Sequence, residues 1–235
     1  MDKGAAIAIR HRFASWHPVP AARAAADAHP FRRLLGAAGW AALPPAVQAR
    51  FARKVAGGAC VSYVGEVVSC RMSLIGKIFA QLARFVGAPL PLGEDAGGAA
   101  QVSVTGDASG LSQYWTRSYA RAGDFPQTIH SVKRFAGPTG LEEYLGYGIG
   151  IALRLEVAEQ ALLFVSDHYF VRLGGVRVRL PRWMEPGQLT VSHIDCGADE
   201  QGRGRFAFVL ELAHPLFGEL FHQLALFADP EGEAA

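Results

Sequence analysis

From Gln101 to Asp229 the chain is a succession of short segments in which apolar and polar residues alternate, separated by turn residues at close and fairly even spacing. A period of two places successive side chains on opposite faces of a strand, and Gly, Pro, Asn and Asp mark the turns between strands. The clearest breaks are Asp107–Gly110, Gly137–Gly140, Gly174–Gly175, Pro186–Gly187 and Asp199–Gly202. This pattern predicts an antiparallel β-meander, sandwich or barrel.

Ten strands are expected in this part of the chain, and one more, Cys60–Val68, precedes it. The ten are Gln101–Gly106, Leu111–Tyr119, Thr128–Ala136, Leu141–Tyr147, Ile149–Glu156, Ala161–Phe170, Val176–Leu180, Leu189–Ala198, Arg205–Ala213 and Leu220–Phe227. So many consecutive antiparallel strands tend to curl or close, because a wide open sheet leaves exposed edges. We therefore predict a mainly β (α+β) fold. Its large, strongly curved antiparallel up-and-down sheet would form a half-barrel or barrel similar to lipocalins and bacterial lipoprotein carriers.

Short N-terminal helices are expected before the sheet. Phe31–Gly39 carries apolar residues on one side, and Pro44–Pro45 can open a second helix, since proline is tolerated in the first helical turn. In that second helix Val47, Phe51 and Val55 recur at the spacing of a core-facing stripe.

The most amphipathic segment of the chain begins after Ser73, a good N-cap, and ends at Gly87 and Pro89. Its apolar face consists of Leu74, Ile75, Ile78, Phe79, Leu82, Phe85 and Val86. We expect this face to pack on the sheet. The alternatives are a helix that closes the mouth of a β cavity or one that touches a membrane surface.

The length of 235 residues suits one large β domain with an N-terminal extension. We expect a loose Ala-rich leader over 1–30, a single β domain over 31–229 and a disordered tail over 230–235. A net charge of +2 gives no electrostatic argument for nucleic acid. No apolar run approaches the roughly 20 residues that span a bilayer, so we expect a soluble, cytoplasmic protein without a transmembrane segment.

The three cysteines, Cys60, Cys70 and Cys196, are too few and too scattered for a disulfide framework, and they match no zinc-ligand spacing. We expect reduced, buried thiols, as in a cytosolic protein. The histidines also lack local metal spacing, so no metal and no cofactor is expected.

Several motifs in order along the chain resemble one bacterial family. They are the Val64-Gly65 strand, the helix ending at Gly87-Ala88-Pro89, Trp115-Thr116-Arg117, Leu180-Pro181 leading to Pro186, and His214-Pro215-Leu216-Phe217-Gly218. With them, the chain from about Phe31 to Phe227 resembles the DUF4166 domain family, which is uncharacterised. Members sometimes occur fused to NAD-binding dehydrogenase-like domains. This habit suits an accessory interaction module of a dehydrogenase-like system, with a protein partner, although no Gly-x-Gly-x-x-Gly loop supports dinucleotide binding here.

The best candidate site lies on one predicted strand. Trp115, Arg117 and Tyr119 alternate along the chain and so share one strand face. An arginine can hold a carboxylate or phosphate while aromatic rings grip an apolar body, and Phe79 on the amphipathic helix can face the same cavity. The alternative is an exterior cation–π ladder that stabilises the sheet.

Other polar residues are weaker candidates. His193 and Asp195 share a strand face, but Ser192 and Cys196 point away from it and the chain lacks a nucleophile elbow. We interpret this pair as a surface hydrogen bond. Asp167 and His168 are adjacent in a strand, where neighbours face opposite sides, so they are not expected to cooperate.

Two clusters of charge are expected at the surface. Glu142 and Glu143 follow a turn directly and are expected to be solvated. Arg177, Arg179 and Arg182 alternate with apolar residues and indicate a solvated edge strand protected by charge. The alternative for these arginines is a rim that meets an anionic lipid head group or a partner surface.

Three function classes remain open. The first is a non-enzymatic protein that binds an apolar small molecule, lipid or acyl chain in the concave face of the sheet. The second is a cofactor-free enzyme, an isomerase or cyclase, in which Arg117 and one histidine polarise an apolar substrate. The third is an accessory interaction module. Binding predicts an apolar interior with one or two polar anchors, catalysis predicts converging titratable groups, and a module predicts a filled core.

Overall fold

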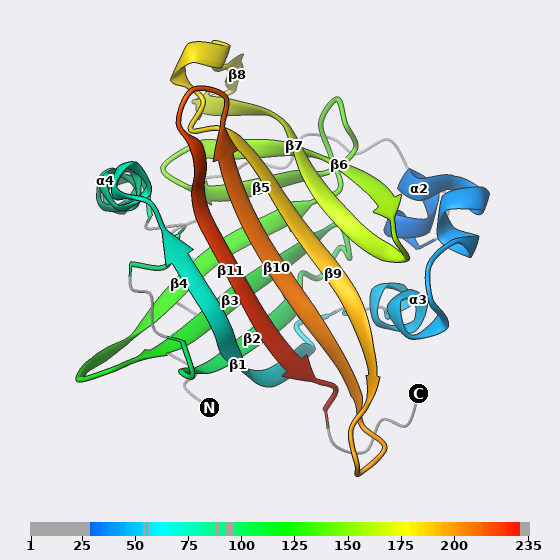
Figure 1. Ribbon diagram of the computed structural model, residues 1–235. Coiled ribbons are helices and arrows are strands. Elements are labelled where there is room, and N and C mark those ends of the chain that lie inside the picture. Colours follow the sequence, from blue (N-terminus) through cyan, green and yellow to red (C-terminus); the bar gives the residue numbers. More distant parts are fainter. Residues whose placement is uncertain (1–28, 54, 56, 88–89, 93–95, 231–235) are drawn as a thin grey trace.

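The structure is a computed structural model that describes residues 29–53, 55, 57–87, 90–92 and 96–230. In this part of the chain eleven antiparallel strands form one sheet, and ten of them close into a barrel (Figure 1). The strands are β1 (Cys60–Met72), β2 (Ala99–Gly106), β3 (Ser112–Arg121), β4 (Asp124–Arg134), β5 (Glu142–Gly146), β6 (Ile149–Ala158), β7 (Ala161–Leu173), β8 (Val176–Arg179), β9 (Gln188–Ala198), β10 (Gly204–His214) and β11 (Gly218–Ala228). The predicted mainly β fold is confirmed.

Chain neighbours pair around the barrel, and the pairing of β1 with β11 closes it. The exception is β8. The first half of the long strand β7 pairs with β9, from Leu162 to Val165, and its last residues pair with β8, from Phe170 to Leu173. β8 is therefore an eleventh strand outside the closed barrel. β8 and β9 do not pair, so the predicted up-and-down order has one exception.

The closing pair depends on a glycine. A Cβ atom built at Gly65 of β1 would lie 1.8 Å from the carbonyl oxygen of Leu226 in β11, so only glycine lets the two backbones approach this closely. The register of the pair also shifts between Val67 and Ser69. Such an irregularity bends a strand, which helps a sheet to curve into a barrel.

Helices α2 (Pro30–Ala41) and α3 (Pro45–Ala52) cover one end of the barrel, on the right in Figure 1. Phe31 packs edge-on against Phe51 at 5.1 Å between ring centroids and reaches Phe164 of β7 at 6.1 Å. The Arg50 guanidinium binds Asp195 at 2.9 Å and Asp229 at 2.8 Å. Aromatic packing and these ion pairs fix the helices as the closed end. The predicted leader lies mostly outside the described residues.

The opposite end carries α4 (Leu74–Ala83) and the 3-10 turn η1 (Arg84–Val86), with α4 on the left in Figure 1. The Ser73 hydroxyl caps α4 by accepting from the Gly76 amide at 3.0 Å, as predicted. Gly76 lies against the Leu220 carbonyl of β11, and Gly87, with φ of 112°, lies against the Leu145 carbonyl of β5. The segment thus crosses from β1 and β11 to β5.

The expectation that the large apolar side chains of α4 pack on the sheet is wrong in part. Gly76 and Ala80 are buried, whereas Leu74 and Ile78 of α4 and Phe85 of η1 are exposed. The helix approaches the barrel with its smallest side chains, because a bulkier residue at 76 would collide with the β11 backbone. Leu82 is exposed as well, while Ile75 and Phe79 are partly buried and pack against the core.

Candidate functional site

The barrel interior contains a cavity of about 340 Å³. Its walls are largely apolar, and they include Val102, Ile151, Leu189, Phe208 and Leu210. Leu82 of α4 and Met184 also line it, although 57% and 51% of these residues are exposed. The cavity therefore reaches the surface between α4 and the 3-10 turn η2 (Arg182–Met184). Its volume is in the usual range for small-molecule sites.

The structure places all four predicted site residues on the cavity wall. Trp115, Arg117 and Tyr119 alternate along β3 and face the interior, and Phe79 reaches the cavity from α4. The exterior ladder that was the alternative for β3 is thereby excluded. Burial raises the pKa of Tyr119, so its phenol stays protonated.

Two further charged residues line the cavity, and the sequence interpretation missed both. The Nζ atom of Lys133 in β4 lies 2.9 Å from Oε2 of Glu143 in β5. Arg117 donates from Nη2 to Ser131 Oγ at 2.9 Å and lies 3.4 Å from Glu143 Oε1. Lys133 also sits over the Trp115 ring, 4.3 Å from its centroid.

Burial and charge act against each other in this group. Burial alone would raise the pKa of Glu143, but Lys133 and Arg117 outweigh it and hold the pKa at about 2. Burial lowers the pKa of Lys133, an effect that Glu143 opposes and Arg117 reinforces. Glu143 is therefore a carboxylate at neutral pH, and Arg117 is a permanent cation beside it.

Arg117 has unused hydrogen-bonding capacity. Its Nε atom is buried and has no hydrogen-bond partner in the described part of the protein. Buried polar atoms nearly always have a partner. Among the lining residues described, Arg117 and Lys133 are the cations and Glu143 the acid, so cationic side chains outnumber carboxylates. The site can accept an anionic group next to an apolar body.

The expectation that Glu142 and Glu143 are solvated is wrong, since both are buried. They face opposite sides of β5. Glu143 points inward to Lys133, while Glu142 points outward, where it accepts from Arg177 Nε at 2.9 Å and from the Tyr144 hydroxyl at 2.6 Å. Pairing with cations and a hydroxyl on each face makes this burial tolerable.

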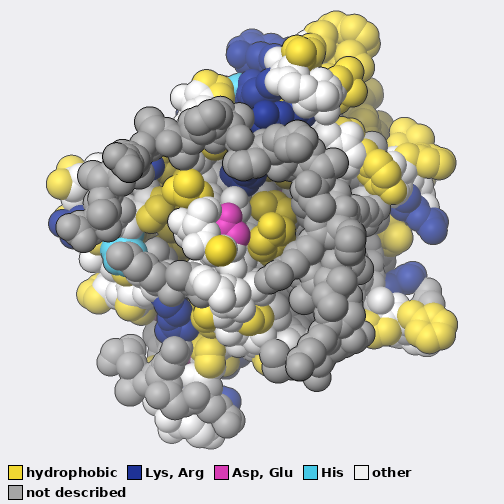
Figure 2. Space-filling model, turned by 180° about the vertical axis from the view of Figure 1, so that it is seen from behind, with side chains coloured by type: hydrophobic (Ala, Val, Ile, Leu, Met, Phe, Trp, Pro, Cys, Tyr) yellow, Lys and Arg dark blue, Asp and Glu magenta, His cyan; other side chains and the backbone are white. Residues whose placement is uncertain are grey.

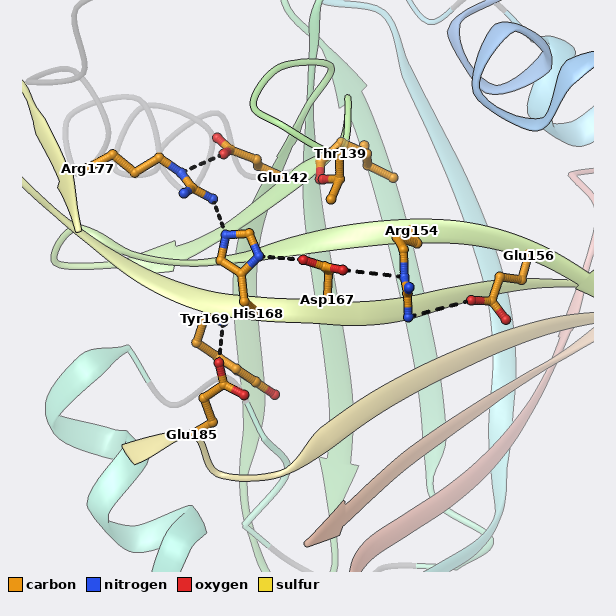
Figure 3. A network of polar contacts seen from close by, with 10 residues as sticks. Thr139, Glu142, Arg154, Glu156, Asp167, His168, Tyr169, Arg177 and Glu185 are labelled. Atoms are coloured by element: carbon orange, nitrogen blue, oxygen red, sulfur yellow. Dashed lines mark hydrogen bonds and ion pairs between the residues drawn. The ribbon is translucent and has the colours of Figure 1, made fainter. Parts of the chain in front are cut away.

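The expectation that Asp167 and His168 cannot cooperate is also wrong. His168 Nδ1 lies 2.6 Å from Asp167 Oδ2, and His168 Nε2 lies 2.8 Å from Arg177 (Figure 3). The register with β6 jumps from Ser166 to His168, which leaves Asp167 as an extra residue. This β-bulge puts two successive side chains on the same outer face. The network lies outside the cavity.

His193 is buried rather than part of a surface hydrogen bond. Its ring stacks on Phe206 at 4.7 Å and meets Phe51 and Phe208 edge-on at 5.0 Å each. Asp195 instead binds Arg50. The pair therefore gives no catalytic arrangement, and His193 belongs to the packing beneath α3.

The described residues contain no helix long and apolar enough to cross a membrane. Within the same residues, no group of three or more His, Cys, Asp or Glu side chains is arranged to hold a metal ion. None of the three cysteines, all of which are among the described residues, forms a disulfide, but Cys60 and Cys196 are exposed, so the expected burial holds for Cys70 alone.

A family model described as a domain of unknown function, DUF4166, matches residues 43–227. This match covers most of the chain and confirms the predicted resemblance. No curated protein and no solved structure matches the chain.

Proposed function

The chain belongs to the DUF4166 family, and we propose that its barrel binds an apolar small molecule or acyl chain that carries an acidic group. The observation that carries the proposal is the open apolar cavity in which Arg117 and Lys133 face a single carboxylate. An apolar body would replace water against the wall. An anionic head would complete the charge balance and give the buried Arg117 Nε an acceptor.

The parts of the ligand would be recognised by different residues. Arg117 presents planar donors suited to a carboxylate or phosphate. Glu143 is a weak competitor for it, because its contact of 3.4 Å is longer than a strong charge-assisted hydrogen bond. Trp115, Phe208 and Phe79 would contact the apolar body. We place this binding in the cytoplasm, where the three cysteines, none of which forms a disulfide, would stay reduced.

A titration tests the proposal. Delipidated protein is titrated calorimetrically with decanoate and with decan-1-ol, which share a chain but differ in charge. A charge-assisted hydrogen bond is worth about 1.5–3 kcal/mol, so decanoate should bind at least about tenfold more tightly. Arg117→Gln should remove the difference while decanol binding persists. Failure of both compounds to bind would contradict the proposal.

One observation favours an enzyme as a second candidate. Arg117, Lys133 and Glu143 are titratable groups that converge in the cavity, as a catalytic site would require. No histidine is among the described lining residues, so the histidine expected in the isomerase or cyclase hypothesis has no support. A compound recovered chemically changed after incubation would favour catalysis, and one recovered unchanged would favour binding. The third class, an accessory interaction module, predicts a filled core, and the cavity argues against it.

A further inference from the structure

We infer that the open end of the barrel docks on the surface of an anionic lipid bilayer. Docking is argued from the exposed residues at the barrel mouth alone. Entry of a ligand from the bilayer into the cavity rests in addition on the proposed function. The feature that carries it is an apolar rim around the mouth, formed by Ile78, Leu82, Phe85, Trp183, Met184 and Leu216. All six are exposed, and Phe85, Trp183 and Leu216 are 81%, 81% and 82% exposed.

Strand register brings the three segments of the rim to one end. β1 ends at Met72, directly before α4, and Met72 pairs with Phe221 just after the β10–β11 turn that holds Leu216. Gln188, which follows η2 closely, pairs with Ala213 just before that turn. Figure 1 accordingly shows α4, the β10–β11 turn and β8 around the same end.

Basic residues accompany the apolar rim. Four are exposed: Lys77 of α4, Arg84 of η1, Arg179 of β8 and Arg182 of η2. Neither residues 74–86, nor 174–184, nor 214–218 contain an acidic residue. Figure 2 shows hydrophobic side chains next to Lys and Arg over β8 and η2 at the top, and again over α4 on the right.

This composition fits a lipid surface best. Large apolar side chains can enter the head-group boundary while neighbouring cations meet anionic lipids. A second copy of the chain would bring the same cations face to face, which is unfavourable. The bilayer also explains why the rim is continuous with the cavity. Leu82 and Met184 belong to both, so an acyl ligand could pass from lipid to barrel without crossing water.

Vesicle flotation tests the inference. The protein is mixed with vesicles of phosphatidylcholine alone or with phosphatidylglycerol added. We expect binding to anionic vesicles to be at least about tenfold stronger. The double variant Phe85→Ser/Trp183→Ser should lose at least about tenfold in this binding, since each side chain contributes buried apolar area. Val64→Ser, at an exposed apolar position on the outer barrel wall away from the rim, should have no effect.

A second readout follows Trp183 directly. Its emission should shift to the blue with anionic vesicles, and Trp183→Phe should abolish the shift. Absence of binding to anionic vesicles, or binding unaffected by the double variant, would overturn the inference. It would also be overturned if the protein formed a dimer that the same double variant dissociates.

The outcomes separate docking from ligand binding. Phe85 and Trp183 do not line the cavity, so the double variant should bind decanoate as the wild type does. Lost docking with intact decanoate binding would remove only the inference. Docking without decanoate binding would remove only the proposed function.

Discussion

Lys133 and Glu143 lie directly opposite each other on β4 and β5, and their side chains meet at 2.9 Å inside the barrel. Their side chains are 7% and 5% exposed. A buried pair of this kind stabilises little by itself, because both charges lose their hydration. Removing one partner is nevertheless strongly destabilising, because it leaves the other buried charge uncompensated.

We predict that Glu143→Gln lowers the free energy of unfolding by about 3–5 kcal/mol, because it leaves Lys133 and Arg117 without their carboxylate. Urea unfolding measures this change. Glu156→Gln is the matched control, since Glu156 is half exposed and lies 3.9 Å from Arg154. It should change stability by less than about 0.5 kcal/mol. Equal effects of the two substitutions would refute the buried pair.

The contribution of Glu143 to the free energy of unfolding should also be sensitive to acid. Its folded-state pKa of about 2 lies below the ordinary value of 4.5. The contribution is therefore fully present above about pH 4.5 and is lost as pH falls towards 2. Stability curves of wild type and Glu143→Gln should converge across that window. Parallel curves would show that Glu143 does not titrate in this way.

His193 is also expected to make the protein less stable as the pH falls, but in a less acidic range than Glu143. Burial and the nearby Arg50 lower its pKa from 6.5 to about 3. Below pH 6.5 the unfolded chain binds a proton that the folded protein does not, so stability falls as the pH drops. We expect a loss of about 2 kcal/mol between about pH 7 and pH 5 from this group.

Two substitutions test whether His193 causes this dependence of stability on pH. His193→Leu should weaken the dependence, because the titrating group is gone. Phe208→Leu removes a ring packed on His193 and should lower stability by a similar amount at both pH values. An unchanged slope in His193→Leu would mean that another group is responsible.

Arg50 should be essential for holding α3 on the barrel. Its side chain is 5% exposed and bridges Asp195 of β9 and Asp229 after β11. We expect Arg50→Met to cost about 3–5 kcal/mol, since two carboxylates lose their partner. Thermal and urea unfolding would measure it. Arg32→Met, at an exposed position of α2, should be close to neutral.

The cysteines give a simple check of the fold. Cys60 and Cys196 are exposed, while Cys70 is buried in β1. A thiol reagent should therefore modify two cysteines rapidly and the third only after denaturation. Fast reaction of Cys70 in the folded protein would mean that its side chain is exposed and that β1 does not pack as described.

The sequence was sufficient for the strands, because alternation and turn residues are local signals. The sequence also indicates that Lys133 and Glu143 pair across a hairpin. Lys133 and Glu143 are equally distant from Pro138 in the recognised Gly137–Gly140 turn, so a hairpin centred there pairs them. Reading that register would have moved Glu143 from the solvent to the interior.

Other features could not be predicted locally. The bulge at Asp167 depends on how β7 must bend between β6, β8 and β9, and nothing in the residues near 167 marks it. The side of α4 that faces the barrel depends on the close contact of Gly76 with the Leu220 carbonyl of β11, which is far away in the sequence. A periodic apolar face shows that a helix is amphipathic, but not which side approaches its neighbour.

Native mass spectrometry of freshly purified protein, followed by organic extraction of any bound compound, would show whether the barrel binds an apolar acid. We expect a one-to-one complex with an apolar acid, or formation of such a complex when delipidated protein is mixed with decanoate. A chain that carries nothing after purification and takes up no decanoate in excess would contradict it.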